Sequence, residues 1–192
     1  MALRNAVKAA EICGYDAPDI WSRVAEGLRL HRNSDGVTME YSGYAGEQIK
    51  QADVNLLAYP LGVITEPDQI RRDLSYYEDK IDMVNGPAMT FSIFSIQYAR
   101  LGDRQKADEM FRRAYESNIR PPFGVFAETP TSNNPYFMTG AGGLLQAVLF
   151  GFGGLSLTDE GIVQSTPMLP EGWSRLEIKG VGPTKRTFVV EN

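Results

Sequence analysis

The sequence contains very few of the residues that enzymes commonly use as nucleophiles, bases and metal ligands. Cys13 is the single cysteine and His31 the single histidine among 192 residues. One cysteine excludes an internal disulfide and a cysteine-based zinc site. A Ser-His-Asp or Cys-His arrangement would have to use His31, and no Gly-x-Ser-x-Gly motif precedes a helical segment. We therefore set that class of hydrolase aside and expect neither metal nor cofactor, with Cys13 a buried small residue and His31 a surface residue.

Long apolar runs and concentrated positive charge are also missing. No segment is long and apolar enough to cross a membrane, and the first residues are broken by charges too soon for a signal peptide. No Asn-x-Ser/Thr glycosylation acceptor occurs. The net charge is -5, and the basic residues are dispersed among acids. These absences weakly favour an intracellular location and predict no membrane partner and no nucleic-acid partner.

Helical spacing of apolar residues dominates the first three quarters of the chain. A hydrophobic content of 43% is enough for a core. Asp103 is expected to cap the helix that follows it. The expected helices cover residues 3–12, 20–30, 47–59, 67–80, 89–101, 106–117 and 144–150.

After Gly153 and Gly154 the pattern changes to short alternating segments between glycine and proline turns. It predicts strands at residues 155–157, 161–163, 176–179 and 187–191. We therefore expect a helical domain over residues 1–152 and a β-rich tail or partial domain over residues 153–192. Successive helical hairpins fit an α-solenoid or a toroid. Residues 98–114 are similar to the middle of a tetratricopeptide repeat, but a solenoid needs further copies and none is found.

Glu128 is the most informative candidate for chemistry. It lies on a turn and is followed by a polar, aromatic and glycine-rich loop that opens onto an apolar segment. A carboxylate in this setting is typical of one side of a sugar-cleaving site. The simpler interpretation is an exposed loop glutamate with no role in catalysis.

Six segments in the same order resemble glycoside hydrolase family 65, which includes acid trehalases, glucosyl-galactosyl-hydroxylysine glucosidases and disaccharide phosphorylases. The matching segments are Ile49–Leu61, Asp73–Glu78, Gly86–Ser92, Phe126–Glu128, Pro135–Gly143 and Gln146–Leu155. The resemblance implies a mainly α fold, with the chain forming part of an (α/α)6 barrel followed by the start of a β-rich region. It also implies inverting chemistry on an α-linked glucose.

By position, the resemblance makes Glu128 the general base that activates water. The family's general acid lies in a motif that should precede Met1, and nothing in this chain matches it. General acid catalysis commonly contributes a factor of about 10²–10⁴. We therefore expect the isolated chain to be inactive unless the N-terminal part of the same enzyme, or a second chain, supplies the acid.

The resemblance also implies substrate-binding residues. Lys50 and Gln51 correspond to residues that hydrogen-bond the glucose at the cleavage point, whereas the plainer interpretation is two surface residues at a helix start. Tyr136, with Phe137, stacks on a sugar ring or simply plugs the barrel mouth. Asp53 is a less favoured acid, for which a structural salt bridge is the preferred interpretation.

Thr139 and Gly140 open a glycine-rich segment before an apolar helix, where backbone amides could hold phosphate. The phosphorylases of the family carry histidine and serine around this loop, and this chain has threonine and glycines there instead. The difference favours the hydrolytic branch.

These observations predict the C-terminal part of an inverting α-glucoside hydrolase. Its expected substrate is trehalose or a related α-glucosyl disaccharide or glycan, such as one with a glucosyl-α-1,2-galactose linkage. Two alternatives stay open: a disaccharide phosphorylase, and a non-catalytic truncated paralogue that binds a carbohydrate or a protein.

Overall fold

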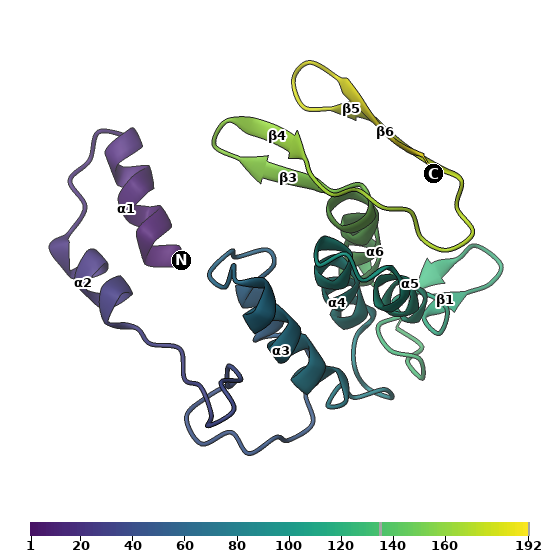
Figure 1. Ribbon diagram of the computed structural model, residues 1–192, viewed down its shortest axis with the longest axis horizontal. Helices are drawn as coiled ribbons and strands as arrows, with labels where there is room; N and C mark the ends of the chain where they lie inside the picture. Colours follow the sequence, from purple (N-terminus) through teal and green to yellow (C-terminus); the bar gives the residue numbers. More distant parts are fainter. Residues whose placement is uncertain (135, 192) are drawn as a thin grey trace.

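Helices form most of the chain up to residue 152, and antiparallel hairpins follow (Figure 1). The computed structural model describes residues 1–134 and 136–191, so Pro135 of the matching segments lies outside the described residues. The helices are α1 (Ala2–Ile12), α2 (Asp19–Gly27), α3 (Pro67–Glu78), α4 (Ala88–Arg100), α5 (Arg104–Arg113) and α6 (Met138–Gln146). A 3-10 turn spans Asn55–Leu57, and a π-helical segment, Ala147–Phe152, continues α6.

The described strands form three separate two-stranded hairpins. They are β1 (Ile119–Arg120) with β2 (Val125–Phe126), β3 (Leu155–Thr158) with β4 (Gly161–Gln164), and β5 (Arg175–Val181) with β6 (Arg186–Glu191). The four strands predicted after residue 153 are confirmed. β5 and β6 pair in register, with Leu176 opposite Val190, so the last strand has a partner. The β1–β2 hairpin was not predicted, because its two-residue strands are too short to show alternation.

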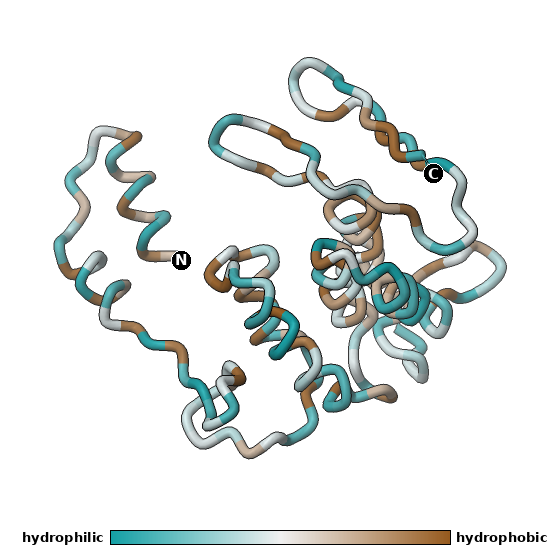
Figure 2. The backbone as a smooth tube through the Cα atoms, viewed as in Figure 1, coloured by the Kyte–Doolittle hydropathy of each residue, from teal (hydrophilic) through white to brown (hydrophobic). Residues whose placement is uncertain are grey.

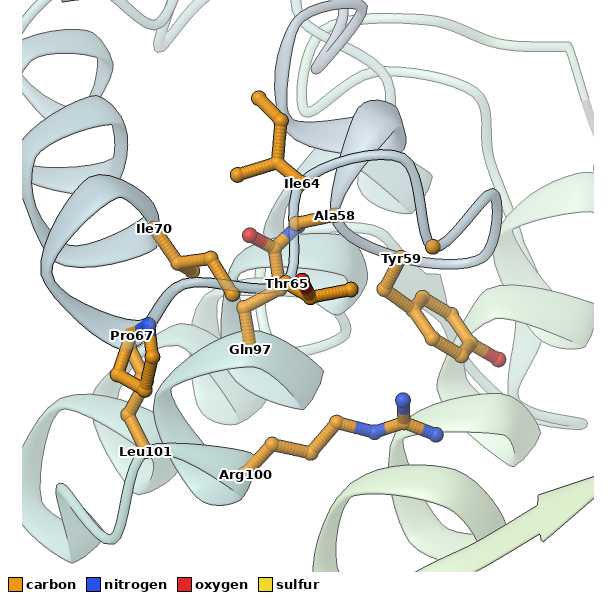
Figure 3. Close-up of a pocket in the computed structure, with 10 residues that line it drawn as sticks. Ala58, Tyr59, Ile64, Thr65, Pro67, Ile70, Gln97, Arg100 and Leu101 are labelled. Carbon is orange, nitrogen blue, oxygen red and sulfur yellow. The ribbon is translucent and has the colours of Figure 1, made fainter. Parts of the chain in front are cut away.

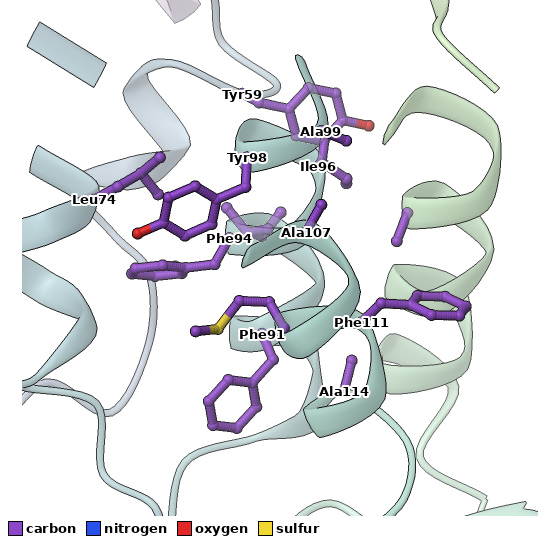
Figure 4. Close-up of a cluster of buried hydrophobic side chains, with 14 of the residues drawn as sticks. Tyr59, Leu74, Phe91, Phe94, Ile96, Tyr98, Ala99, Ala107, Phe111 and Ala114 are labelled. Atoms are coloured by element: carbon purple, nitrogen blue, oxygen red, sulfur yellow. The ribbon is translucent and has the colours of Figure 1, made fainter. Parts of the chain in front are cut away.

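α4 is the centre of the hydrophobic core. Every residue of α4 except Met89 and Arg100 is buried. α5 and α6 pack on it, and Leu74 of α3 joins Phe94 and Tyr98 in the same cluster (Figure 4). A helix buried on all sides shows little amphipathic spacing, which is why residues 89–101 have an almost unbroken apolar sequence.

The predicted start of α5 is confirmed. The Asp103 side chain accepts a hydrogen bond from the Lys106 backbone N–H at 3.1 Å, as an N-cap does. The helix ends at Arg113, earlier than predicted, and the chain then turns into β1.

α1 and α2 stand apart from the core, on the other side of α3 from α4 (Figure 1). Both were predicted, although α2 ends at Gly27. Neither helix contains a buried residue. The prediction that Cys13 is buried is therefore wrong: Cys13 is an exposed free thiol, because the pair contributes nothing to the core. His31 is exposed, as predicted.

The helix predicted at residues 47–59 is the main error. Ile49, Ala52 and Val54 are buried, as the spacing implied, but only the 3-10 turn is helical. Ile49 instead pairs its backbone with residues 80–82, donating to the Lys80 carbonyl and accepting from the Asp82 N–H, each at 2.8 Å. These bonds replace the ones a helix would make.

The structure confirms a mainly α protein with a few small hairpins. Along the backbone, α6 is mainly apolar and α5 mainly hydrophilic (Figure 2). Within the described residues no helix is long and apolar enough to cross a membrane.

Candidate functional site

Residues 40–53 form an irregular segment, here called the strap, beside a hollow of about 380 Å³. Lys50 and Gln51, the two predicted glucose-binding residues, both line this hollow and are exposed. Their expected alternative, two surface residues at a helix start, is wrong in one respect, because neither lies in a helix. The complete lining is Glu40, Tyr41, Tyr44, Glu47, Gln48, Ile49, Lys50, Gln51 and Asp53.

Hydrogen bonds from α3 hold the chain immediately before the strap. The Thr38 N–H, just before the strap, donates to the Asp73 carboxylate at 2.9 Å, and the Tyr77 hydroxyl donates to the Thr38 carbonyl at 2.8 Å. Gln69 donates to the same Asp73 oxygen at 2.9 Å. All four side chains are buried. Buried hydrogen bonds to a charged group fix geometry strongly, so the strap has a defined conformation without regular secondary structure.

Lys50 is anchored at the first turn of α4. The Thr90 hydroxyl donates to the Lys50 carbonyl at 3.3 Å. Gly86 lies in the same corner, where an added Cβ would stand 2.3 Å from the Asp82 carbonyl oxygen. The backbone at Lys50 is therefore tied to α4, while the exposed residue also lines the hollow.

Glu128 is anchored at the same turn. The Ala88 N–H, the first residue of α4, donates to the Glu128 carbonyl at 3.2 Å, and the Asn118 amide donates to it at 3.1 Å. The residue is half-buried, and its carboxylate forms no ion pair with any described residue. A carboxylate held by its backbone but without a cationic partner remains available to a ligand or a water molecule.

Gly140 packs on the first turn of α4. A Cβ at Gly140 would lie 3.1 Å from the Ala88 Cβ and 3.2 Å from Phe126. Gly143 similarly touches Ser92. The prediction that these glycines precede a helix is wrong, since α6 already begins at Met138. They allow α6 to approach α4 closely, and this packing explains them without a phosphate.

Thr139 and Tyr136 lie next to this contact but point outward. Thr139 is exposed in the first turn of α6. Tyr136 is 74% exposed and has a positive φ of 63°. Left-handed backbone is uncommon for a bulky residue and clusters at ligand sites. Tyr136 therefore does not plug the interior of this chain.

Three of the predicted residues thus share one anchor. Lys50, Glu128 and Gly140 each contact Ala88 or Thr90, although they are up to 90 positions apart in the sequence. In the sequence, Gln51 is next to Lys50 and Thr139 is next to Gly140. Tyr136 precedes Thr139 by three residues and is exposed. The preferred interpretation of Asp53 is wrong: it lies in a turn, not in a helix, and forms no salt bridge with a described residue.

Glu40 is a residue of the hollow that the sequence did not single out. Burial, and next the nearby charge of Asp53, raise the pKa of the Glu40 carboxyl, while a hydrogen bond from the Val54 backbone acts in the opposite direction. Burial likewise raises the pKa of the Tyr44 phenol to about 12. No motif marks Glu40, because its setting depends on a fold of the strap that the apolar spacing did not predict.

A second cavity of about 300 Å³ lies at the opposite end of α4 (Figure 3). Gln97 and Arg100 of α4 and Leu101, just after it, line this cavity. Tyr59 and Ile64, before α3, and Ile70, within α3, also line it. None of the predicted site residues lines it. Among the described residues, no group of three His, Cys, Asp or Glu side chains is arranged to hold a metal ion.

Comparison with known proteins links these segments to one family. Residues 29–125 match the glycosyl hydrolase family 65 central catalytic domain. The chain is 49% identical over 189 residues to a kojibiose hydrolase of Mucilaginibacter mallensis, covering 98% of this chain and 28% of that protein. It is 39% identical over 171 residues to a protein-glucosylgalactosylhydroxylysine glucosidase of Dictyostelium discoideum, covering 88% of this chain and 24% of that protein. The chain therefore spans about a quarter of the length of these relatives.

The fold has a counterpart among solved structures. A putative kojibiose phosphorylase from the human microbiome superposes with a TM-score of 0.57 over 75% of this chain and 20% of its own. Sequence identity is 20%, so the likeness concerns the fold alone.

Proposed function

The chain belongs to glycosyl hydrolase family 65, and on this premise we propose that it is the C-terminal part of an inverting α-glucoside hydrolase. The observation that carries the proposal is the shared anchor of Lys50 and Glu128 at the first turn of α4. This turn holds a sugar-binding candidate and a catalytic candidate at one end of the most buried helix. The helices would be part of an (α/α)6 barrel over residues 1–152, completed by sequence outside this chain.

In this proposal Glu128 is the general base. Its carboxylate takes a proton from a water molecule as that water attacks the anomeric carbon. The bond from this carbon to the glycosidic oxygen breaks, the departing sugar takes a proton from a general acid, and glucose is released with inverted configuration. Inversion requires a general acid on the opposite side, with the two carboxyl groups about 6.5–9.5 Å apart. That acid would come from the upstream part of the enzyme or from a second chain.

Lys50 and Gln51 would hold the glucose during this step. The Lys50 ammonium donates hydrogen bonds, and the Gln51 amide both donates and accepts, which suits a ring that carries several hydroxyl groups. Tyr136 would offer an aromatic face from the exposed side, with Thr139 and Gly140 completing the rim. The substrate is a glucosyl disaccharide or glycan, and the names of the relatives make kojibiose the first to test, followed by trehalose.

Hydrolysis is favoured over phosphorolysis by the packing of α6. In the phosphorylase alternative, the backbone amides of the glycine-rich segment 140–143 would bind phosphate. Gly140 and Gly143 contact α4 instead, so packing accounts for them. A non-catalytic binding module is the second candidate, because the chain spans about a quarter of its relatives and α1 and α2 contain no buried residue.

The decisive experiment is a glucose-release assay on the complete enzyme that contains this chain, with and without phosphate. We expect Glu128→Gln to lower kcat by orders of magnitude with a modest effect on KM, because it removes a base used only in the transition state. Glu160→Gln, in the exposed turn between β3 and β4, is the matched control. Near-normal turnover of the Glu128 variant would remove Glu128 from the mechanism, and activity that requires phosphate would favour the phosphorylase.

A further inference from the structure

A hollow of about 440 Å³ lies at the end of α4 opposite the candidate sugar site. Arg100 of α4, Gln146 of α6 and Ser156 of β3 line it, and we call it the Arg100 hollow. Arg100 also lines the neighbouring cavity of Figure 3. Ten positions of α4 separate Arg100 from Thr90, the anchor of Lys50, which corresponds to about 15 Å along the helix axis. The Arg100 hollow is therefore separate from the residues of the proposed function.

Arg100 presents a guanidinium group that is held in place without an acidic partner. Its Nε donates to the Phe150 carbonyl at 3.1 Å, and its Nη2 donates to the Leu155 carbonyl at 3.3 Å and to the Ser156 Oγ at 3.4 Å. The group also lies over the Tyr59 ring, 4.7 Å from the ring centroid (Figure 3). Among the described residues Arg100 forms no ion pair, and its Nη1 makes no hydrogen bond. An exposed guanidinium with donors to spare, fixed in one position, is suited to bind an oxyanion.

The other polar side chains of the hollow also have donors to spare, because their acceptors are already used. The Gln146 Oε1 atom accepts a hydrogen bond from the Tyr59 hydroxyl at 2.7 Å, and the Gln146 amide N–H groups have no partner among the described residues. The Ser156 Oγ accepts from Arg100, so its own proton is available. Of the described residues that line the hollow, none is acidic. A guanidinium, an amide N–H and a hydroxyl together favour an anionic ligand over a cation.

Apolar side chains line the rest of the hollow. Leu157 is 71% exposed, Pro60 is exposed and Phe150 is half-buried, so their surfaces are within reach of a ligand. The volume of about 440 Å³ lies within the range of small-molecule sites and exceeds what a bare ion would fill. The hollow thus combines a donor array with an apolar wall.

We propose that the Arg100 hollow binds a small organic anion. Its carboxylate or phosphate oxygens accept hydrogen bonds from Arg100, Gln146 and Ser156, and its apolar body packs against Phe150 and Leu157. This inference goes beyond the proposed function, because none of these residues is a candidate for glucose binding or for catalysis.

The test is an NMR titration of the purified chain, observed at the backbone amides of residues 150–157 and at the Arg100 Nε–H. Phenyl phosphate and benzoate each join an anion to a ring, inorganic phosphate is the anion alone, and benzyl alcohol is the ring alone. We expect saturable shifts with phenyl phosphate or benzoate, and the tighter of the two identifies the oxyanion. Inorganic phosphate and benzyl alcohol should bind at least about tenfold more weakly, because each lacks one half of the contacts.

Gln146→Glu tests the site with the fold preserved, since Gln146 is exposed and a glutamate still accepts from Tyr59. The added negative charge repels an anion, so we expect at least about tenfold weaker binding. Arg100→Lys keeps the charge but loses the guanidinium fork, and it should weaken binding similarly. The matched controls are Gln105→Glu and Arg104→Lys, both exposed in α5 and outside the hollow, which should bind as the wild type does. The spectrum of each free variant verifies its fold.

Calorimetric titration of the complete enzyme that contains this chain repeats the measurement with the same probes and variants. Two results would overturn the proposal. The first is no saturable binding of either organic anion, or equal binding by Gln146→Glu and the wild type. The second is binding by the isolated chain that disappears in the complete enzyme, because another part of the enzyme then fills the hollow. A glucose titration observed at residues 40–53 tests the proposed function separately, so that either proposal can fail alone.

Discussion

Among single residues, Glu40 shows most clearly how burial of an ionisable side chain opposes stability. Burial and the neighbouring Asp53 raise its pKa, so the folded protein holds the Glu40 proton more tightly than the unfolded chain does. The stability that this proton contributes is fully present below the ordinary glutamate pKa and is lost as the pH rises through the raised value. At neutral pH an ionised Glu40 therefore destabilises the fold, a cost often seen at functional sites.

We predict that Glu40→Gln raises the Tm at neutral pH and that the gain disappears below the ordinary pKa of glutamate. Glutamine has nearly the same shape but carries no charge to desolvate. Thermal unfolding of both proteins across this pH range measures the difference, with Glu160→Gln as the exposed control. A Tm gain that is the same at every pH would mean that the charge of Glu40 is not what destabilises the fold.

The sequence alone pointed to Lys50, Gln51 and Glu128 but not to Glu40, and the reason is physical. The first three occur in segments whose residue types are distinctive in order and spacing. Glu40 acquires its setting from the path of the strap, which depends on contacts with Asp73 and Tyr77, more than 30 positions away. Tertiary hydrogen bonds of that kind leave no local pattern.

At the scale of elements, the glycines of α6 show tertiary packing overriding helix propensity. Glycine costs about 1 kcal/mol relative to alanine in a helix interior, so a run of them predicts a break. α6 nevertheless continues through Gly140, Gly142 and Gly143. Gly140 and Gly143 face α4, while a Cβ at Gly142 would meet nothing within 4 Å.

This difference between neighbours gives a matched pair of variants. We predict that Gly142→Ala stabilises the protein by up to about 1 kcal/mol through helix propensity. Gly143→Ala should instead be destabilising, because its Cβ would stand 3.1 Å from the Ser92 hydroxyl and 3.2 Å from the Ser92 Cβ. Overpacking of this kind typically costs about 1–3 kcal/mol, which exceeds the propensity gain. Urea unfolding measures both, and equal stabilisation by the two variants would show that α6 and α4 are not in tight contact.

The cap of α5 is an element that the sequence predicted correctly, since its cause is local. We expect Asp103→Ala to lower the free energy of unfolding by about 0.5–2 kcal/mol, because the Lys106 N–H loses its acceptor. Asp103→Ser, which keeps a capping oxygen, should lose much less. If the alanine and serine variants unfold at the same denaturant concentration, the hydrogen bond does not stabilise the helix.

At the scale of the whole molecule, apolar residues are distributed unevenly between the two ends of the chain. The β5–β6 hairpin buries Leu176, Ile178, Phe188 and Val190 in the same cluster as α4. α1 and α2 contain no buried residue. Ile12 at the end of α1 is 76% exposed, and Leu28, just after α2, is 72% exposed. Isolated helices of 9 and 11 residues are marginal in water, so this pair depends on contacts that the described chain does not give it.

Deletion variants test this division. Removing residues 1–30 should leave the Tm nearly unchanged. Among the described residues, Lys8 with Asp159 is the one ion pair between this segment and the rest, and it is exposed and contributes little. Removing residues 175–191 should destabilise the protein by several kcal/mol, since burying each large apolar side chain contributes about 1.5–3 kcal/mol. Hydrogen exchange of the intact chain supplies an independent measure, with fast exchange expected in α1 and α2 and slow exchange in α4. A large drop in Tm on removing residues 1–30, with slow exchange in α1, would mean that the two helices pack onto the core in solution.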